Sequence, residues 1–224
     1  MMQNISGFTF IHDGVNGGYP FVEAIRMVRI FADEIVVVDM QSTDETRKVL
    51  ERLGVRIIDG EWFPKTAGEC LAKAHALNVE CEHDIIWHFE ADEVFSGDLA
   101  KHIAYAIHKH DTRQIKVWRL QVEQNFQRIR WYPELVHRIF EKGSVQKDGH
   151  TTRQHQKELL TITEIPPERG YLWDVTNCFR DDWEQRLRQQ AELWGGMPQY
   201  RYVPYHFTMA PCSLATGNSR RLLN

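Results

Sequence analysis

The sequence predicts an α/β fold in which a mostly parallel sheet is flanked by helices and followed by a C-terminal extension. Over the first hundred residues, short β-rich runs alternate with helical patterns at the spacing of strand–helix–strand units. The run Glu34–Asp39 (EIVVVD) is apolar at successive positions, as expected when helices cover both faces of a sheet. Polar residues also follow several of the predicted strands, which is typical of a ligand site at one sheet edge.

The first half of the chain contains four predicted strands separated by three predicted helices. Pro20 suits the first residue of the first helix. Ser42 and Glu45 have the spacing of a capping box before the second helix, and Gly54 is expected to end it. A third helix is predicted over residues 67–79. The predicted strands cover residues 6–11, 34–39, 55–58 and 84–89.

The pattern changes after about residue 110. Residues 114–122, 134–140 and 159–165 are predicted strands, and the two prolines at 166 and 167 then interrupt the chain. Residues 181–194 form a strong helical pattern with acids at its start, and an aromatic tail follows. We therefore predict a catalytic domain over residues 1–165 and a helical, aromatic extension over residues 166–224 that packs on it.

Composition limits the classes of function. The chain has 224 residues, 42% hydrophobic and 26% charged, with a formal net charge of -4, so a nucleic acid partner is not expected. The four cysteines form no C-x-x-C pair, which argues against a zinc knuckle or redox motif. The N-terminus lacks a signal-peptide pattern, and no run approaches the roughly 18 apolar residues that a transmembrane segment needs. These features predict a cytoplasmic protein without a transmembrane segment.

Three predicted strands end in polar residues. His12 and Asp13 follow the first strand, Asp39 closes the second, and the acids of Glu90–Glu93 follow the fourth. The carboxyl ends of parallel strands meet at one edge of a sheet, where ligands bind in folds of this class. We therefore expect these residues to surround one site.

The stretch WHFEADEVF places three acids, Glu90, Asp92 and Glu93, within four residues. Like charges at this spacing repel, so a metal, a basic partner or solvent must balance them. Carboxylates are the ligands that Mg²⁺ and Mn²⁺ prefer, and a metal would let acids face a diphosphate. The acidic pattern alone fits a solvated turn equally well.

The sequence resembles the family 2 glycosyltransferases, which have the GT-A fold and transfer a sugar from a nucleotide-diphosphate donor. The resemblance rests on FADEIVVVDMQSTDET at residues 31–46 and on EADEV at residues 90–94, together with YPFVEAIRMVRI at residues 19–30. It covers roughly residues 5–110. It implies a GT-A-like fold, a Mn²⁺ or Mg²⁺ cofactor, a UDP-, GDP- or dTDP-sugar donor, and a saccharide or lipid-linked acceptor.

The resemblance also implies roles for single residues. Asp39 lies where the family contacts the nucleoside, and Asp44 belongs to the S-T-D turn that shapes that pocket. Asp92 matches the last acid of the D-x-D motif and is the expected metal ligand. Glu90 stands where Asp is usual, so it could reach the metal, a metal-bound water or the ribose. Met40 replaces a second Asp that reads uracil in many relatives, which leaves the base open.

Two further assignments complete the predicted site. His12, at the end of the first strand, joins the donor-binding set. His206 is a candidate third metal ligand, and the alternative is that its ring only packs among the neighbouring aromatic residues.

The catalytic base is read from the second half of the chain. Relatives often have R-x-F, here residues 138–140, and then a polar motif ending in His-Glu, for which this chain has KDGHT at residues 147–151. We predict Asp148 or His150 as the base and keep Glu134 as a spare candidate.

The predicted activity is metal-dependent sugar transfer with inversion. A role in the synthesis of cell-surface polysaccharides or glycans would fit it. An alternative is a catalytically impaired nucleotide-sugar or carbohydrate-binding module with the same fold, which the departures at Met40, Glu90 and Thr151 would fit. A nucleotidyltransferase is disfavoured, because HDGVNGG lacks the Arg and Lys of that class's first loop.

Overall fold

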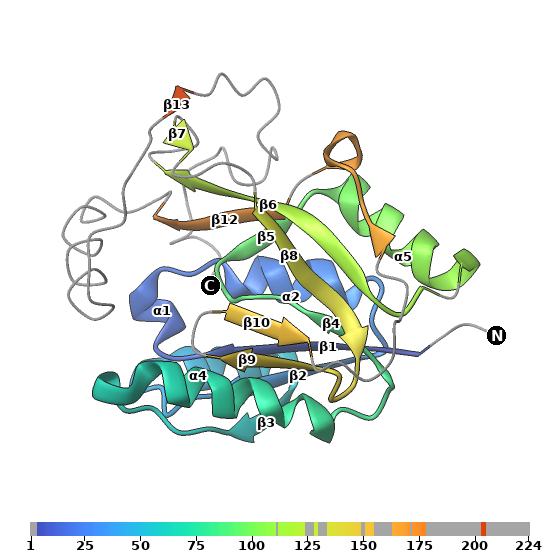
Figure 1. Ribbon diagram of the computed structural model, residues 1–224. Coiled ribbons are helices and arrows are strands. Elements are labelled where there is room, and N and C mark those ends of the chain that lie inside the picture. The colour runs from blue at the N-terminus through green and yellow to red at the C-terminus, as the bar shows by residue number, and fades with distance from the viewer. Residues whose placement is uncertain are drawn as a thin grey trace.

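The protein is described from a computed structural model (Figure 1). The predicted helix over residues 181–194 and the predicted site residues His150 and His206 lie outside the described part of the chain. The structure describes residues 4–110, 112–123, 128–129, 134–148, 151–154, 163–170, 172–177 and 203–204.

Four parallel strands form one half of the main sheet. They lie in the order β4, β1, β2, β3, so the predicted strand–helix alternation does produce a parallel arrangement. Their bounds are β1 Ile5–Ile11, β2 Glu34–Asp39, β3 Arg56–Asp59 and β4 Ile85–His88.

The other half of the sheet is largely antiparallel. β8 (Glu134–Glu141) pairs antiparallel with both β4 and β6 (Ile115–Glu123), so the complete sheet is mixed. β12 (Leu172–Asn177) pairs with β6 and with β5 (Glu93–Phe95), which directly follows the acidic residues. The shorter strands are β7 Arg128–Ile129, β9 Val145–Asp148, β10 Thr151–Gln154, β11 Thr163–Glu164 and β13 Val203–Pro204.

Helices cover both faces of the parallel strands, as the apolar run in β2 predicts. Figure 1 shows α4 and the β9–β10 hairpin on one side of β1 and α2 and α5 on the other. Alternate residues of β1 enter two separate cores, because Ile5 and Ile11 pack with α2 and α5 while Phe8 and Phe10 pack with α4. The helices are α1 Gly14–Gly17, α2 Phe21–Arg29, α3 Thr46–Leu53, α4 Ala67–Ala76 and α5 Gly97–His110.

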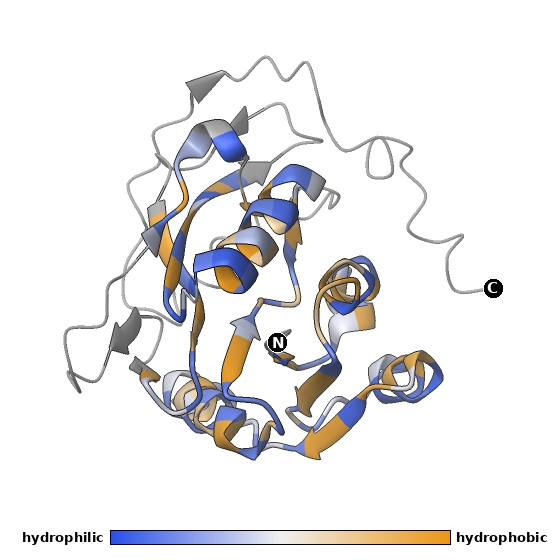
Figure 2. Cartoon of the chain, turned by 90° about the vertical axis from the view of Figure 1, so that its right-hand side faces the viewer, coloured by the Kyte–Doolittle hydropathy of each residue, from blue (hydrophilic) through white to orange (hydrophobic). Residues whose placement is uncertain are grey.

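The hydropathy of the chain agrees with this layering. In Figure 2 hydrophobic residues predominate in several strands, whereas the helices and the remaining strands carry both hydrophobic and hydrophilic residues. No helix in the described residues is long and apolar enough to cross a membrane. The predicted cytoplasmic location stays a prediction.

Residues 14–17 of the Gly-rich stretch after β1 form the short helix α1. One local expectation is wrong. The capping box is not formed, because α3 begins at Thr46 without a side-chain cap and Ser42 instead accepts a hydrogen bond from the backbone N–H of Asp13. Gly54 ends α3 in the left-handed conformation (φ 63°), as predicted.

Candidate active site

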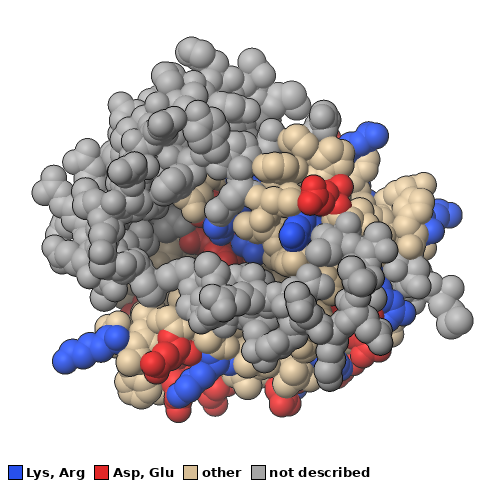
Figure 3. Space-filling view, viewed as in Figure 1, with Lys and Arg blue, Asp and Glu red and all other residues tan. Residues whose placement is uncertain are grey.

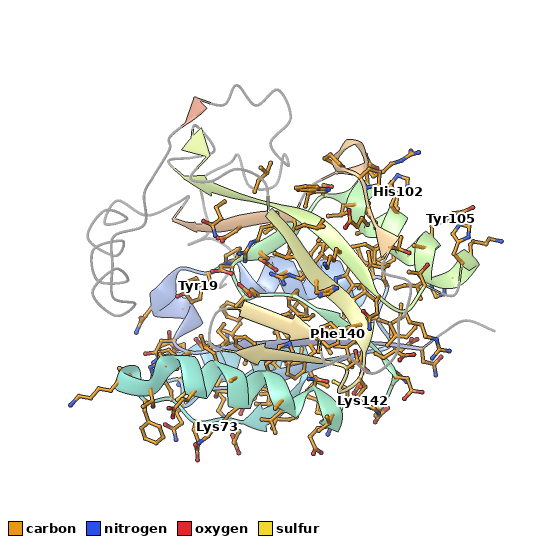
Figure 4. The ribbon with its side chains drawn as sticks, viewed as in Figure 1. Tyr19, Lys73, His102, Tyr105, Phe140 and Lys142 are labelled. Carbon is orange, nitrogen blue, oxygen red and sulfur yellow. The ribbon has the colours of Figure 1, made fainter. Side chains whose placement is uncertain are left out.

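A cavity of about 450 Å³ lies at the carboxyl ends of the parallel strands. Three predicted site residues, His12, Glu90 and Asp92, line it together. Figure 4 labels Tyr19, another lining residue, beside α1. Lys142, whose N–H donates to Asp84 just before β4, lies at the opposite end of the parallel strands. The lining residues are Phe10, Ile11, His12, Asp13, Asn16, Gly17, Tyr19, Met40, Trp62, Leu71, Glu90, Ala91 and Asp92.

An aromatic pair forms part of the cavity wall. The ring of His12 stacks on Trp62 with 4.7 Å between centroids and 24° between planes. The Nδ1–H of His12 donates to the carbonyl oxygen of Met40 at 2.7 Å, which fixes the orientation of the ring. The cavity therefore offers a flat, partly polar surface next to β1.

Two segments, residues 12–18 after β1 and residues 40–46 after β2, are here called the loop pair. They contribute His12, Asp13, Asn16, Gly17 and Met40 to one wall of the cavity. Asp13 adopts the left-handed conformation (φ 46°) and joins the two loops. Its Oδ1 accepts the backbone N–H of Thr43 at 2.6 Å, and its own N–H donates to Ser42 Oγ at 3.0 Å. Gly17 is needed for close packing here, since a Cβ would lie 2.8 Å from the ring of Tyr19.

Asp39, a predicted nucleoside contact, is almost completely buried at the end of β2. Its carboxylate accepts the N–H of Ser42 at 3.0 Å and a guanidinium N–H of Arg47 at 3.2 Å. Asp39 is not among the lining residues of the cavity. In the described structure it shapes the loop after β2.

Asp44 also links the two segments of the loop pair through hydrogen bonds. Its carboxylate accepts the N–H of Asn16 at 2.7 Å and the N–H of Thr46 at 2.9 Å. Burial raises the pKa of Asp44, but the hydrogen bonds from Thr46, Asn16 and Val15 outweigh that effect and the pKa is lowered. Asp44 also lies outside the cavity lining, so its observed contacts are structural.

The opposite wall is a four-residue turn, Glu90–Glu93, here called the acidic turn. The N–H of Glu93 donates to the carbonyl of Glu90 at 3.0 Å, as in a hydrogen-bonded β-turn. The N–H of Glu90 in turn donates to Oε2 of Glu93, also at 3.0 Å. The two middle residues, Ala91 and Asp92, are thereby held against the cavity.

Two arginines supply the positive charge that the acidic turn requires. Arg138 on β8 binds Glu93 through Nε, at 2.8 Å from Oε2, and through Nη2 to Oε1. Arg119 on β6 lies 3.3 Å from Glu93 Oε1 and 3.4 Å from Glu90 Oε2. Figure 3 shows acidic and basic side chains next to one another near the middle of the face of the molecule in view. Of the three ways to offset the repulsion among these acids, a metal, a basic partner or solvent, the basic partner is present for Glu90 and Glu93.

Burial makes this charge cluster unusual. Glu93 is 0% and Arg138 2% exposed, whereas Glu90 keeps 25% of its side chain exposed on the cavity side. Burial lowers the pKa of Arg119, but the carboxylates of Glu90, Glu93, Asp174 and Asp92 outweigh it, so the pKa lies above its ordinary value. The guanidinium group of Arg119 therefore stays charged.

Neither arginine has a role predicted from the sequence, although the sequence contains a signal for both. Each lies beside large apolar residues in a predicted strand, Arg119 between Trp118 and Leu120 and Arg138 before Ile139 and Phe140. A charge at such a position needs a buried partner. The partner of Arg138 lies 45 residues away, so only the fold reveals it.

The predicted base candidates are only partly described. Asp148 ends β9, where it pairs with Thr151 of β10, and β9 packs against α4. Glu134 begins β8. The roles of Asp148 and Glu134, and of the undescribed His150 and His206, stay predictions.

Comparison with known proteins identifies the family. The sequence model described as "Glycosyl transferase family 2" matches residues 20–179, which is most of the chain and includes both acidic motifs. The chain belongs to the family 2 glycosyltransferases. Its mixed, mostly parallel sheet flanked by helices is the GT-A-like fold that the sequence predicts.

Relatives in Rickettsia carry the same family name. An "Uncharacterized glycosyltransferase" of Rickettsia felis is 28% identical over 121 residues, which cover 54% of this chain and 40% of that protein. One from Rickettsia bellii is 37% identical over 82 residues, 37% of this chain and 26% of that protein. The chain thus spans less than half the length of these relatives.

Solved structures show a distant likeness. Residues 1–349 of TarS from Staphylococcus aureus give a TM-score of 0.47 at 11% identity, covering 85% of this chain and 65% of that chain. Glucosyl-3-phosphoglycerate synthase from Mycobacterium tuberculosis, in complex with Mn²⁺, UDP and glucosyl-3-phosphoglycerate, gives 0.39 at 15% identity, covering 52% and 44%. Likenesses of this extent assign no ligand to this chain.

The donor set of the cavity limits how this glycosyltransferase could hold a metal. No group of three or more His, Cys, Asp or Glu side chains suited to a metal occurs within the described residues. Asp92 and Glu90 nevertheless share the cavity lining, and Mg²⁺ is usually held by one or two carboxylates together with substrate phosphates. The residues fit a cation shared with a diphosphate better than one enclosed by protein alone.

Proposed function

We propose that this domain transfers a sugar from a nucleotide-diphosphate donor to an acceptor hydroxyl with inversion, in a reaction that depends on a divalent cation. The observation that carries the proposal is the cavity itself. Its volume of about 450 Å³ is in the range of small-ligand sites, and a carboxylate from the family's acidic motif, Asp92, lines it. The proposal includes residues 1–165 as the donor-binding domain and the following residues as an extension, whose strand β12 pairs with β5 and β6.

The nucleoside of the donor would lie against the loop pair. The stacked rings of His12 and Trp62 provide a flat face for a base or ribose, and Asp39 and Asp44 hold the loops that carry this surface. Met40 is buried beside them, where many relatives carry an Asp that reads uracil. The proposed donors therefore remain UDP-, GDP- and dTDP-sugars.

The diphosphate would lie against the acidic turn. Mn²⁺ or Mg²⁺, when bound, would neutralise the phosphates and stabilise the departing diphosphate. Asp92 is the proposed ligand from this chain, with Glu90 beside it. Asp92 matches the last acid of the family's D-x-D motif, so we assign the stronger cation contact to Asp92, with Glu90 held beside it by two guanidinium groups.

In the proposed transfer, the acceptor hydroxyl oxygen forms a bond to the anomeric carbon while the bond from that carbon to the diphosphate oxygen breaks. The hydroxyl proton passes to a base, for which Asp148 and His150 are the candidates. The acceptor would be a saccharide or a lipid-linked saccharide. Its site is expected next to β9, which Asp148 ends.

The test is nucleotide release from a panel of UDP-, GDP- and dTDP-sugars, with and without Mn²⁺, in the presence of a saccharide acceptor library. We expect cation-dependent release from at least one donor and its loss in Asp92→Asn. Donor binding without release on any acceptor would favour the catalytically impaired binding module. A chain that neither binds nor turns over any donor would contradict both.

A further inference from the structure

The ion pair between Glu93 and Arg138 lies behind the acidic turn, away from the solvent. Glu93 has no exposed surface, and Arg138 is 2% exposed. Neither residue lines the cavity. A direct contact between either side chain and a donor is therefore excluded in this arrangement.

The pair is nevertheless connected to both residues that face the cavity. Glu93 Oε2 accepts the backbone N–H of Glu90 at 3.0 Å and Arg138 Nε at 2.8 Å. The backbone N–H of Glu93 closes the same turn on the carbonyl of Glu90. Glu93 thus forms hydrogen bonds to both backbone polar groups of Glu90. Ala91 and Asp92 form the part of the turn that these two bonds enclose.

Arg138 also acts on the side chain of Glu90. Its Nη2 lies 3.5 Å from Glu90 Oε1, while Arg119 Nη1 lies 3.4 Å from the other carboxylate oxygen, Oε2. Two guanidinium groups on adjacent antiparallel strands therefore orient a carboxylate that is 25% exposed on the cavity side. A planar guanidinium fixes such geometry, whereas an ammonium would supply charge without direction.

Stability alone does not account for this arrangement. Burying two charges costs desolvation energy, and replacing such a pair by hydrophobic residues is often neutral or stabilising. A fold that needed only a filled core could use apolar residues here. The distinctive consequence of the pair is the fixed geometry of the acidic turn.

We infer that Arg138 and Glu93 are positioning residues that hold the acidic turn so that Asp92 and Glu90 face the bound cation and diphosphate. The inference rests on the proposed function, since it concerns the same site. It assigns a role to two side chains that do not touch the ligand.

The decisive variant is Arg138→Met/Glu93→Leu. It removes one positive and one negative charge, so the net charge around the cavity is unchanged, and it keeps an apolar core. The control is Arg113→Met/Glu141→Leu. This control pair is joined at 3.0 Å, and Glu141 lies on the same strand as Arg138 but pairs with Ile85, at the amino end of β4.

The first measurement is the Kd, in the presence of Mn²⁺, of whichever of UDP, GDP or dTDP binds the parent. The other two are the midpoint of urea unfolding and the rate of hydrogen exchange at the Glu90 amide. In Arg138→Met/Glu93→Leu we expect a retained urea midpoint, a Kd raised at least about tenfold and faster exchange at Glu90. The control should keep the parent Kd. A folded double variant with the parent Kd would overturn the inference while leaving the proposed function intact.

A second variant covers the case in which the double variant does not fold. Arg138→Lys keeps the charge but loses the two-pronged contact with Glu93. It should also raise the Kd and speed exchange at Glu90, and an unchanged Kd would count against the inference. If the parent itself binds none of the three nucleotides, the proposed function fails first, and the positioning role fails with it.

Discussion

The two walls of the cavity differ in the partners and in the burial of their carboxylate groups. In the loop pair, the carboxylates of Asp13 and Asp44 accept backbone N–H groups and lie partly exposed. In the acidic turn, the carboxylate of Glu93 is buried and held by Arg138. Losing a backbone hydrogen bond to an exposed carboxylate lowers the stability only modestly. Losing one partner of a buried ion pair lowers it strongly, because a buried charge is left without compensation.

The largest expected effect comes from removing a single buried arginine. Arg138→Met should lower the free energy of unfolding by about 3–5 kcal/mol, because the buried carboxyl group of Glu93 would lose its main ion-pair and hydrogen-bond partner. Arg47→Met is the matched change beside the loop pair, in the first turn of α3. Arg47 is 45% exposed and binds Asp39 and Asp59, so its loss should cost about 1 kcal/mol or less.

Urea unfolding of both variants measures this contrast. Similar small losses would show that the charge of Glu93 finds another partner. A large loss for Arg47→Met alone would reverse the comparison between the two walls.

The second prediction concerns His137, the neighbour of Arg138 on β8. Burial, with the nearby charges of Lys116 and Arg138, lowers the pKa of His137 from its ordinary 6.5 to about 4. The unfolded chain therefore takes up a proton before the folded chain does as the pH falls. Stability is full above about pH 6.5 and should decline by up to about 3 kcal/mol between pH 6.5 and pH 4.

The free energy of unfolding measured across this pH range tests the prediction. His137→Gln removes the titrating group, so its stability should depend less steeply on pH in the same window. An identical slope in both proteins would assign the pH dependence to other groups.

The smallest of the three stability effects is expected in the loop pair. Asp13→Ala removes the acceptor for the N–H of Thr43 and leaves alanine in a left-handed conformation, which should cost about 1–3 kcal/mol. Asp13→Asn keeps a side-chain acceptor and tolerates that conformation, so it should cost clearly less. Equal unfolding midpoints for the two variants would mean that Asp13 does not join the loops.

The fold could be predicted from the sequence because its signals are local. The apolar run of β2 predicts a strand covered on both faces, and Val36 and Val37 do enter opposite cores. The position of the cavity also follows, since parallel strands bring His12 and Asp92 to one edge. The antiparallel half was less predictable, because β4 pairs with β8 across about fifty residues of sequence.

The chemistry of the acidic turn could be predicted only in part. The sequence indicates that Glu90 and Glu93 need a positive partner, but Arg119 and Arg138 reach them from strands 26 to 45 residues away. The capping box failed for a related reason. Ser42 has a competing partner in Asp13, 29 residues earlier, and this contact is invisible to local spacing.

The proposed function requires that the cavity binds a nucleoside diphosphate together with a divalent cation at Asp92. The most direct measurement is calorimetric titration of UDP, GDP and dTDP with and without Mn²⁺ into the parent, Asp92→Asn and Asp98→Asn. Asp98 provides the matched control, because its side chain is 81% exposed at the start of α5. We predict Mn²⁺-dependent binding of at least one nucleotide, weakened at least about tenfold in Asp92→Asn and unchanged in Asp98→Asn. Binding that is independent of Mn²⁺, or equal in the parent and Asp92→Asn, would contradict the claim.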